Sequence, residues 1–148
     1  MQRVHVIQDF PQPVSELFDY LSEQENLEPL FGAKIKRLSD GDDGTRNGAG
    51  ASRELRVGPL PGFVETNVEV LPEQLIRYRI TKGGILKNHE GVMRFSSQGD
   101  GGSLLDYTIE FDGKLPLIGP IVKRVLTKSI TQGLRRYAAS GKHPVSTP

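Results

Sequence analysis

The feature that most constrains this chain is a long amphipathic pattern near its C-terminal end, in residues 120–139. Apolar or small residues recur there in steps of one, three, four and seven, the spacing of one face of an α-helix. They are Ile121, Val122, Val125, Ser129, Ile130, Gly133, Leu134 and Tyr137. Pro120 suits the first turn of a helix, where its missing N–H is not needed, and Gly141 stands where a helix commonly stops. A stripe of about five turns needs a long apolar surface to lie on.

The residues before this helix supply that surface, because they alternate between apolar and polar side chains as strands do. The alternation is weaker in residues 4–8 and 35–38 and clearer in residues 51–57, 63–71, 76–80, 89–96 and 105–111. Consecutive strands of this kind form an antiparallel sheet with one buried and one solvated face. Matching the apolar faces of two hairpins places Glu69 opposite Arg77 and Arg94 opposite Asp106, as cross-strand pairs on the solvated face.

Two short helical segments follow the first strand. Pro13 can open a helix in which Val14, Leu17, Phe18 and Leu21 share a face, and a second turn spans residues 26–32. The sequence therefore predicts an α+β fold. A curved antiparallel sheet of six to seven strands would wrap around the long C-terminal helix.

Length and composition narrow the class of protein. We expect one domain over residues 1–140 and a disordered tail over residues 141–148, which has no apolar anchor. No apolar run approaches the ~20 residues of a membrane span. The chain has no cysteine, and it begins directly in a strand pattern, so we expect a cytoplasmic protein. The net charge of +1 gives no global attraction to nucleic acid, and a solvated surface is the simplest interpretation of the basic face of the last helix.

Three short segments resemble a known family. Residues 10–21 (FPQPVSELFDYL) resemble its helix-opening segment, and residues 25–30 (ENLEPL) its second helix, although the tryptophan found there is missing. Residues 48–53 (GAGASR) resemble its entry into a cavity-lining strand. The chain thus resembles the START-like SRPBCC superfamily, in particular the polyketide cyclase/dehydrase-like branch, which has a helix-grip fold. The resemblance implies a cavity between sheet and helix for an apolar or amphipathic small molecule.

Strand alternation predicts which side chains face this cavity. The polar candidates are Arg53, Thr66, Tyr78, His89 and Tyr107. The apolar candidates are Leu55, Val64, Val68, Ile80, Met93, Phe95 and Ile109 from the sheet, and Val122, Leu126 and Ile130 from the last helix. A largely apolar pocket with a few polar groups is typical of small-molecule sites.

Each polar candidate has two interpretations. A buried Arg53 either anchors a ligand carboxylate or carbonyl or forms half of an internal ion pair. If it is an anchor, the variant Arg53→Ala weakens ligand binding and leaves folding largely intact. Tyr78 and Tyr107 either donate to a ligand or satisfy their hydroxyls locally. His89 is either a general base or a histidine at a strand edge, the second being favoured. His89, Tyr78 and Arg53 are the candidate catalytic residues.

The leading functional hypothesis is a binding protein that sequesters, carries or senses a lipid-, quinone- or polyketide-like molecule. The alternatives are a cyclase or dehydratase acting on a polyketide-like substrate and a domain that docks on a partner protein. The sequence has no P-loop, nucleophile elbow or metal-binding helix, and residues 40–51 lack the glycine and glutamate of an EF-hand, so we expect neither metal nor cofactor. Exposed sheet edges would permit a homodimer.

Overall fold

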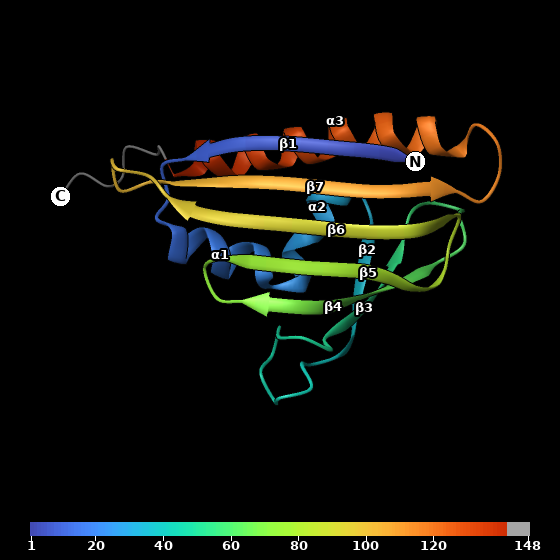
Figure 1. Ribbon diagram of the computed structural model, residues 1–148, viewed down its shortest axis with the longest axis horizontal. Coiled ribbons are helices and arrows are strands. Elements are labelled where there is room, and N and C mark those ends of the chain that lie inside the picture. The colour runs from blue at the N-terminus through green and yellow to red at the C-terminus, as the bar shows by residue number, and fades with distance from the viewer. Residues whose placement is uncertain (142–148) are drawn as a thin grey trace.

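A single antiparallel sheet of seven strands forms the body of the molecule (Figure 1). The computed structural model describes residues 1–141. The strand order is β1-β7-β6-β5-β4-β3-β2. The strands are β1 (Gln2–Phe10), β2 (Lys34–Ser39), β3 (Ser52–Arg56), β4 (Phe63–Leu71), β5 (Leu75–Gly83), β6 (Leu86–Ser97) and β7 (Ser103–Gly113). The first strand, β1, pairs with β7, and every other pair of neighbouring strands is consecutive in the sequence.

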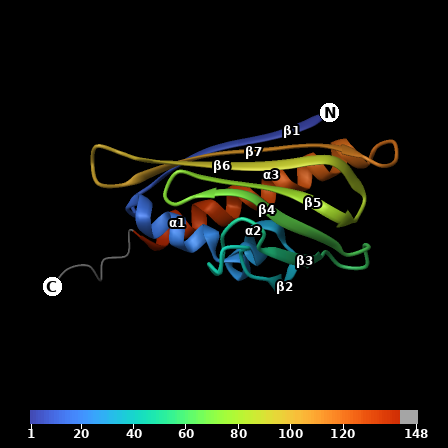
Figure 2. The ribbon, with the colours of Figure 1, turned by 60° about the horizontal axis from the view of Figure 1, so that its bottom comes forward.

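Helices occupy two places in the chain. Between β1 and β2 lie α1 (Val14–Ser22), the 3₁₀ turn η1 (Gln24–Leu27) and α2 (Glu28–Phe31). The long helix α3 (Ile118–Ser140) follows β7 and runs along one face of the sheet (Figure 2). It begins two residues before the predicted residue 120 and ends one residue after residue 139. The predicted α+β helix-grip fold, with its long C-terminal helix, is confirmed.

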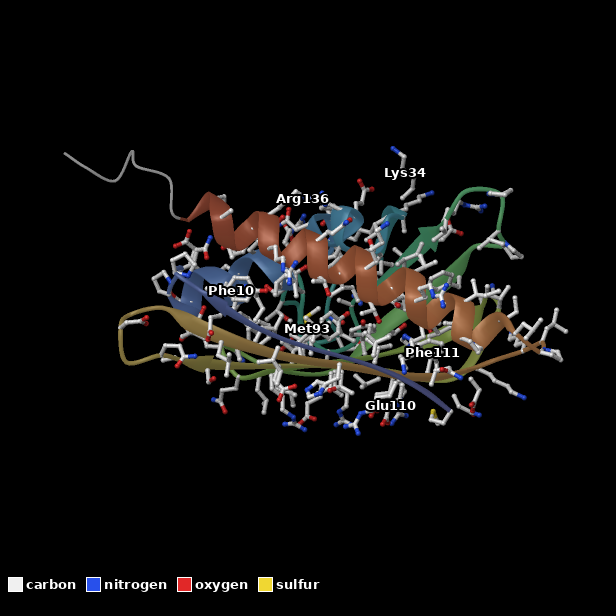
Figure 3. All side chains as sticks on the ribbon, turned by 90° about the horizontal axis from the view of Figure 1, so that it is seen from above. Phe10, Lys34, Met93, Glu110, Phe111 and Arg136 are labelled. Atoms are coloured by element: carbon white, nitrogen blue, oxygen red, sulfur yellow. The ribbon has the colours of Figure 1, made fainter. Side chains whose placement is uncertain are left out.

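The core fills the layer between the sheet and the helices. Figure 3 shows Phe10, Met93 and Phe111 between the sheet and α3, and Glu110 on the opposite face of the sheet. The last helix contributes Ile130, Leu134 and Ala138 to this core, where Ile130 and Leu134 are fully buried. Next to them α3 crosses α2 closely, and the hydroxyl of Ser129 donates to the carbonyl of Leu30 at 2.6 Å.

The predicted cross-strand pairs are both found in the register of the sheet. Glu69 lies opposite Arg77 in β4 and β5, and Arg94 lies opposite Asp106 in β6 and β7. Arg77 and Glu69 form an ion pair. Asp106 instead accepts a hydrogen bond from Nε2 of His5 on β1, at 2.8 Å. Both registers are therefore confirmed.

No helix within residues 1–141 is long and apolar enough to cross a membrane. Of the predicted disordered tail, residues 141–148, all but Gly141 lie outside the described residues.

Candidate ligand-binding site

A cavity of about 300 Å³ lies between the sheet and the first turns of α3. Its wall is largely apolar, and among the described residues only Glu65, Tyr78 and His89 bring polar or charged side chains to it. Five residues of α3 form one side: Ile118, Ile121, Val122, Val125 and Leu126. Ile121 and Val125 are more than half exposed, so they stand at the cavity mouth and not on its inner wall.

Seven of the predicted site residues lie on the cavity wall. They are Leu55, Tyr78, Ile80, His89, Ile109, Val122 and Leu126. The fold therefore brings them together around one space, and their contact with a ligand stays a prediction. Met93, Phe95, Tyr107 and Ile130 are buried in the core and do not line the cavity.

The predicted orientation of β4 is wrong. Val68 is 39% exposed, and the hydroxyl of Thr66 shares a 2.9 Å hydrogen bond with that of Thr81 on the exposed side of the sheet. Val64 is only partly buried and also lies off the cavity wall. The inward residues are instead Glu65 and Asn67, at 4% and 3% exposure.

The reason for this reversal is Arg53, which is 2% exposed on the neighbouring strand β3. A buried guanidinium needs an anion beside it, because an unpaired charge in the interior is costly. Glu65 is the direct cross-strand partner of Arg53 in the sheet register. The strand then returns its apolar residues to the core through a bulge between Asn67 and Glu69, beyond which Val70 packs against the core.

Arg53 is thus half of an internal ion pair, the second of its two interpretations. Its Nε and Nη2 donate to Oε1 of Glu65 at 3.2 and 3.0 Å, and its Nη1 donates to Oδ1 of Asn67 at 3.1 Å. The guanidinium also lies 5.0 Å from the centroid of the Tyr78 ring, a cation–π distance. Arg53 does not line this cavity, and direct contact between Arg53 and a ligand stays a prediction.

Tyr78 and Tyr107 satisfy each other through a hydrogen bond between their hydroxyls. Both rings are at 1% exposure, and burial raises the pKa of both hydroxyls well above the usual value. Gly91 faces the Tyr78 ring and makes room for it, since a Cβ at this position would lie 2.2 Å from Cζ of Tyr78. The tyrosine pair is therefore a protonated internal contact, and Tyr78 is its member on the cavity wall.

His89 faces the interior because it alternates with Gly91, Met93 and Phe95 on the buried face of β6, and the strand is irregular just before it. The pairing with β7 shifts between Lys87 and Glu90, and Asn88 takes a left-handed conformation with φ +53°. The amide of Asn88 donates to Asp112 at 2.9 Å, which holds this irregularity in place. His89 is 8% exposed, so the favoured interpretation as an edge histidine is wrong.

The tautomer of His89 follows from its hydrogen bond. The backbone N–H of Ile80 donates to Nδ1 at 3.0 Å, so the neutral ring carries its proton on Nε2. Burial, the largest influence, lowers the pKa of His89 and favours this neutral form. Its Nε2 lies 3.8 Å from Oε2 of Glu65. A donor and an acceptor thus meet at the inner end of an apolar cavity.

Sequence reasoning missed Glu65, although a signal was present. Once Arg53 is placed inside, its partner has to be an acid within reach on a neighbouring strand. The hairpin between residues 53 and 65 supplies one. Sequence reasoning also missed the mouth residues Leu60, Ile121 and Val125, because exposed aliphatic side chains carry no pattern that marks a cavity rim.

Metal-ligating chemistry is a separate question. Within residues 1–141 no three His, Asp or Glu side chains converge closely enough to hold a metal ion.

Solved structures share this fold at low sequence identity. A START superfamily protein from Mycobacterium smegmatis aligns with a TM-score of 0.76 and 17% identity, covering 93% of this chain and 97% of that one. The ZhuI aromatase/cyclase from Streptomyces sp. R1128 aligns with a TM-score of 0.71 and 14% identity, over 99% and 96% of the two chains. Norcoclaurine synthase from Thalictrum flavum, as a point mutant, aligns with a TM-score of 0.70 and 13% identity, over 96% of each chain.

A search of curated proteins found no match to this sequence. A family model does match, over residues 1–141, and its description is polyketide cyclase / dehydrase and lipid transport. The match spans every element of the fold, from β1 through α3. The predicted resemblance to START-like SRPBCC proteins is thus confirmed, and the chain belongs to the polyketide cyclase / dehydrase and lipid transport family.

Proposed function

We propose that this protein binds a hydrophobic or amphipathic small molecule in the cavity beside α3, and that it sequesters, carries or senses that molecule. The observation that carries the proposal is the cavity itself, with its apolar wall and polar groups at one end. Such a wall stabilises a ligand by removing its apolar surface from water, at about 25 cal/mol per Å². The family description, which includes lipid transport, supports the same function.

The size of the cavity bears on the ligand class. A volume of about 300 Å³ is at the small end of the range for ligand sites. It favours a ring system or a single short chain, such as the head of a quinone or a small polyketide, over a lipid with two acyl chains. The ligand we propose is therefore quinone- or polyketide-like, or a single-chain lipid.

Native mass spectrometry of the purified protein tests this proposal. We expect a retained apolar molecule, identified after extraction, or a rise in the thermal midpoint when apolar compounds are added. An empty protein that gains no thermal stability from a broad set of apolar and amphipathic compounds would contradict the proposal.

A second candidate function is catalysis of a cyclase or dehydratase type. The observation that favours it is the convergence of Glu65 and His89 on the cavity, and the ZhuI aromatase/cyclase has a similar fold. Their roles would differ from the sequence-based hypothesis. The lone pair on Nδ1 of His89 accepts the backbone N–H of Ile80, so His89 would act through Nε2 and donate a hydrogen bond to the substrate. Glu65 would then accept a proton from the substrate. Turnover of a co-purified compound that Glu65→Gln abolishes would support this function.

The remaining predictions concern partners and location. The homodimer, the partner-docking function and the cytoplasmic location stay predictions. Light scattering after size exclusion, pull-down from cell extract and cell fractionation test them in turn.

A further inference from the structure

We propose that Glu65 and His89 form a hydroxyl-recognition subsite at the inner end of the cavity. The ligand would then be an apolar molecule that carries an alcohol or phenol group and not a carboxylate. This inference rests on the proposed binding function and adds the chemical group that the cavity selects. It starts from two buried polar residues, whose side chains taken alone are 5% exposed for Glu65 and 4% exposed for His89, and whose facing atoms do not satisfy each other.

His89 contributes a fixed donor. Its Nδ1 is occupied by the backbone N–H of Ile80, so the neutral ring presents N–H at Nε2. The ring cannot exchange these roles without leaving the Ile80 N–H unpaired inside the protein, which is costly. With Nδ1 held by Ile80, Nε2 faces Oε2 of Glu65.

Glu65 contributes a fixed acceptor. Both hydrogen bonds from Arg53 go to its Oε1, and no residue within 1–141 donates a hydrogen bond to its Oε2. As a carboxylate paired with the guanidinium of Arg53, Glu65 has only acceptor atoms to offer. The strand pairing between Arg53 and Glu65 keeps the carboxylate in this orientation.

The separation of the two atoms decides which ligand group fits. Nε2 of His89 and Oε2 of Glu65 lie 3.8 Å apart, which is too far for a direct hydrogen bond. A hydroxyl can accept from one atom and donate to the other, because it has both a proton and lone pairs. A carbonyl only accepts and would turn lone pairs towards Oε2. A carboxylate would place a second negative charge beside Glu65 in a weakly screened interior.

Among the described residues, the rest of the cavity wall offers no other free polar group. Tyr78 is the third polar residue on the wall, and its hydroxyl is engaged by Tyr107. Arg53, which would attract a carboxylate, lies off the wall and is paired with Glu65. The positive charge of Arg53 is therefore already paired with Glu65 and is not available to bind an acidic ligand.

Three matched probes test the subsite: naphthalene, naphthol and naphthoate, which share a ring system and differ in one group. Dissociation constants are measured with the full chain at neutral pH. We expect naphthol to bind about ten- to a hundredfold more tightly than naphthalene, through two hydrogen bonds of which one is to a charged group. We expect naphthoate to bind more weakly than naphthol.

Two variants separate the subsite from a structural role. Glu65→Gln keeps an oxygen for Arg53 and can turn an NH₂ donor towards the ligand. We therefore expect the affinity for naphthoate to rise relative to the affinity for naphthol. A variant that only loosened the fold would weaken all three probes alike. His89→Phe removes the donor and keeps a ring, and we expect its preference for naphthol over naphthalene to fall. Glu69→Gln, the same change on the outer face of β4, should leave all three affinities unchanged.

The outcomes are distinct. Equal binding of naphthol and naphthalene by the original protein, or tightest binding of naphthoate, overturns the subsite and leaves the binding function standing. If no probe binds and no apolar compound stabilises the protein, both fail. If Glu65→Gln does not fold, a fall in the naphthol preference of His89→Phe supports the subsite and an unchanged preference overturns it.

Discussion

Arg53 and Glu65 place a full pair of opposite charges inside a domain of modest size. Their geometry compensates for the loss of water, since Arg53 makes two hydrogen bonds to one carboxylate oxygen and a third to Asn67. Such a pair contributes little net stability compared with an apolar replacement of both residues, yet the loss of one partner leaves the other charge exposed to a dry interior.

We therefore expect Arg53→Ala to destabilise the protein by about 3–5 kcal/mol, measured by urea denaturation. This reverses the sequence-based expectation that the same change leaves folding largely intact. Arg56→Ala is the matched control, because Arg56 pairs with Glu54 at the surface and its loss should change stability little. A small loss in Arg53→Ala, equal to that in Arg56→Ala, would contradict this account.

His89 gives stability a dependence on pH. Burial lowers its pKa in the folded protein, whereas the unfolded chain takes up a proton near the ordinary value of 6.5. Below that value the unfolded state thus binds more protons than the folded state. The free energy of unfolding therefore decreases as the pH falls. We expect the contribution of His89 to stability to be present above pH 6.5 and to be lost on acidification.

The measurement is the free energy of unfolding at neutral and mildly acidic pH, compared with His89→Phe. The loss on acidification should be smaller in the variant. Equal losses in both proteins would assign the pH dependence to other groups.

The same residues show what sequence can predict about the site. Alternation placed Arg53, Tyr78, His89 and Tyr107 inside, and all four are buried. It failed at β4, where Val64, Thr66 and Val68 were assigned to the interior because they are less polar than Glu65 and Asn67. Residue polarity taken one strand at a time cannot show that a charged neighbour requires an acid to face inward.

At the scale of a strand, β6 depends on a glycine. Gly91 lies opposite Tyr78 in the sheet register, and the Tyr78 ring covers the space that a side chain at Gly91 would need. The tyrosine ring, its contact with Arg53 and its hydrogen bond to Tyr107 all depend on that space.

We expect Gly91→Ala to destabilise the protein by about 1–3 kcal/mol, because the new methyl group would overlap the buried Tyr78 ring. Thermal or urea denaturation measures the loss. Gly99→Ala is the control, since no atom lies within 4 Å of a Cβ placed there. Equal stability of the two variants would show that the ring moves aside without cost.

Elements were predictable where their pattern is continuous. The α3 stripe and the order of the strands could be read from the sequence, because a 3.6-residue or two-residue period persists over many residues. The irregularities in β4 and β6 could not, since a bulge depends on how two strands pair and leaves no period of its own. The irregularity in β6 brings Leu86 to the cavity wall beside His89, and the one in β4 returns Val70 to the core.

For the whole molecule, we expect a larger side chain that fills the cavity to weaken ligand binding. Leu126 lies on the α3 side of the cavity, while Thr127 is exposed on the helix surface. We expect Leu126→Trp to fill part of the space and to weaken the binding of naphthol at least tenfold, measured by calorimetry. Thr127→Trp should leave the affinity unchanged, and an unchanged affinity in Leu126→Trp would place the ligand elsewhere.

The cavity also divides the molecule into parts that tolerate change differently. Its mouth consists of Leu60, Ile121 and Val125, all more than two-fifths exposed, so their replacement disturbs little of the core. Its inner end is built from the same buried residues that hold β3, β4 and β6 together. Single substitutions at the mouth could therefore change which apolar ligand skeleton is preferred, in engineering or in evolution. A new preference for the ligand head group would require compensating changes at Arg53, Glu65 and His89 together.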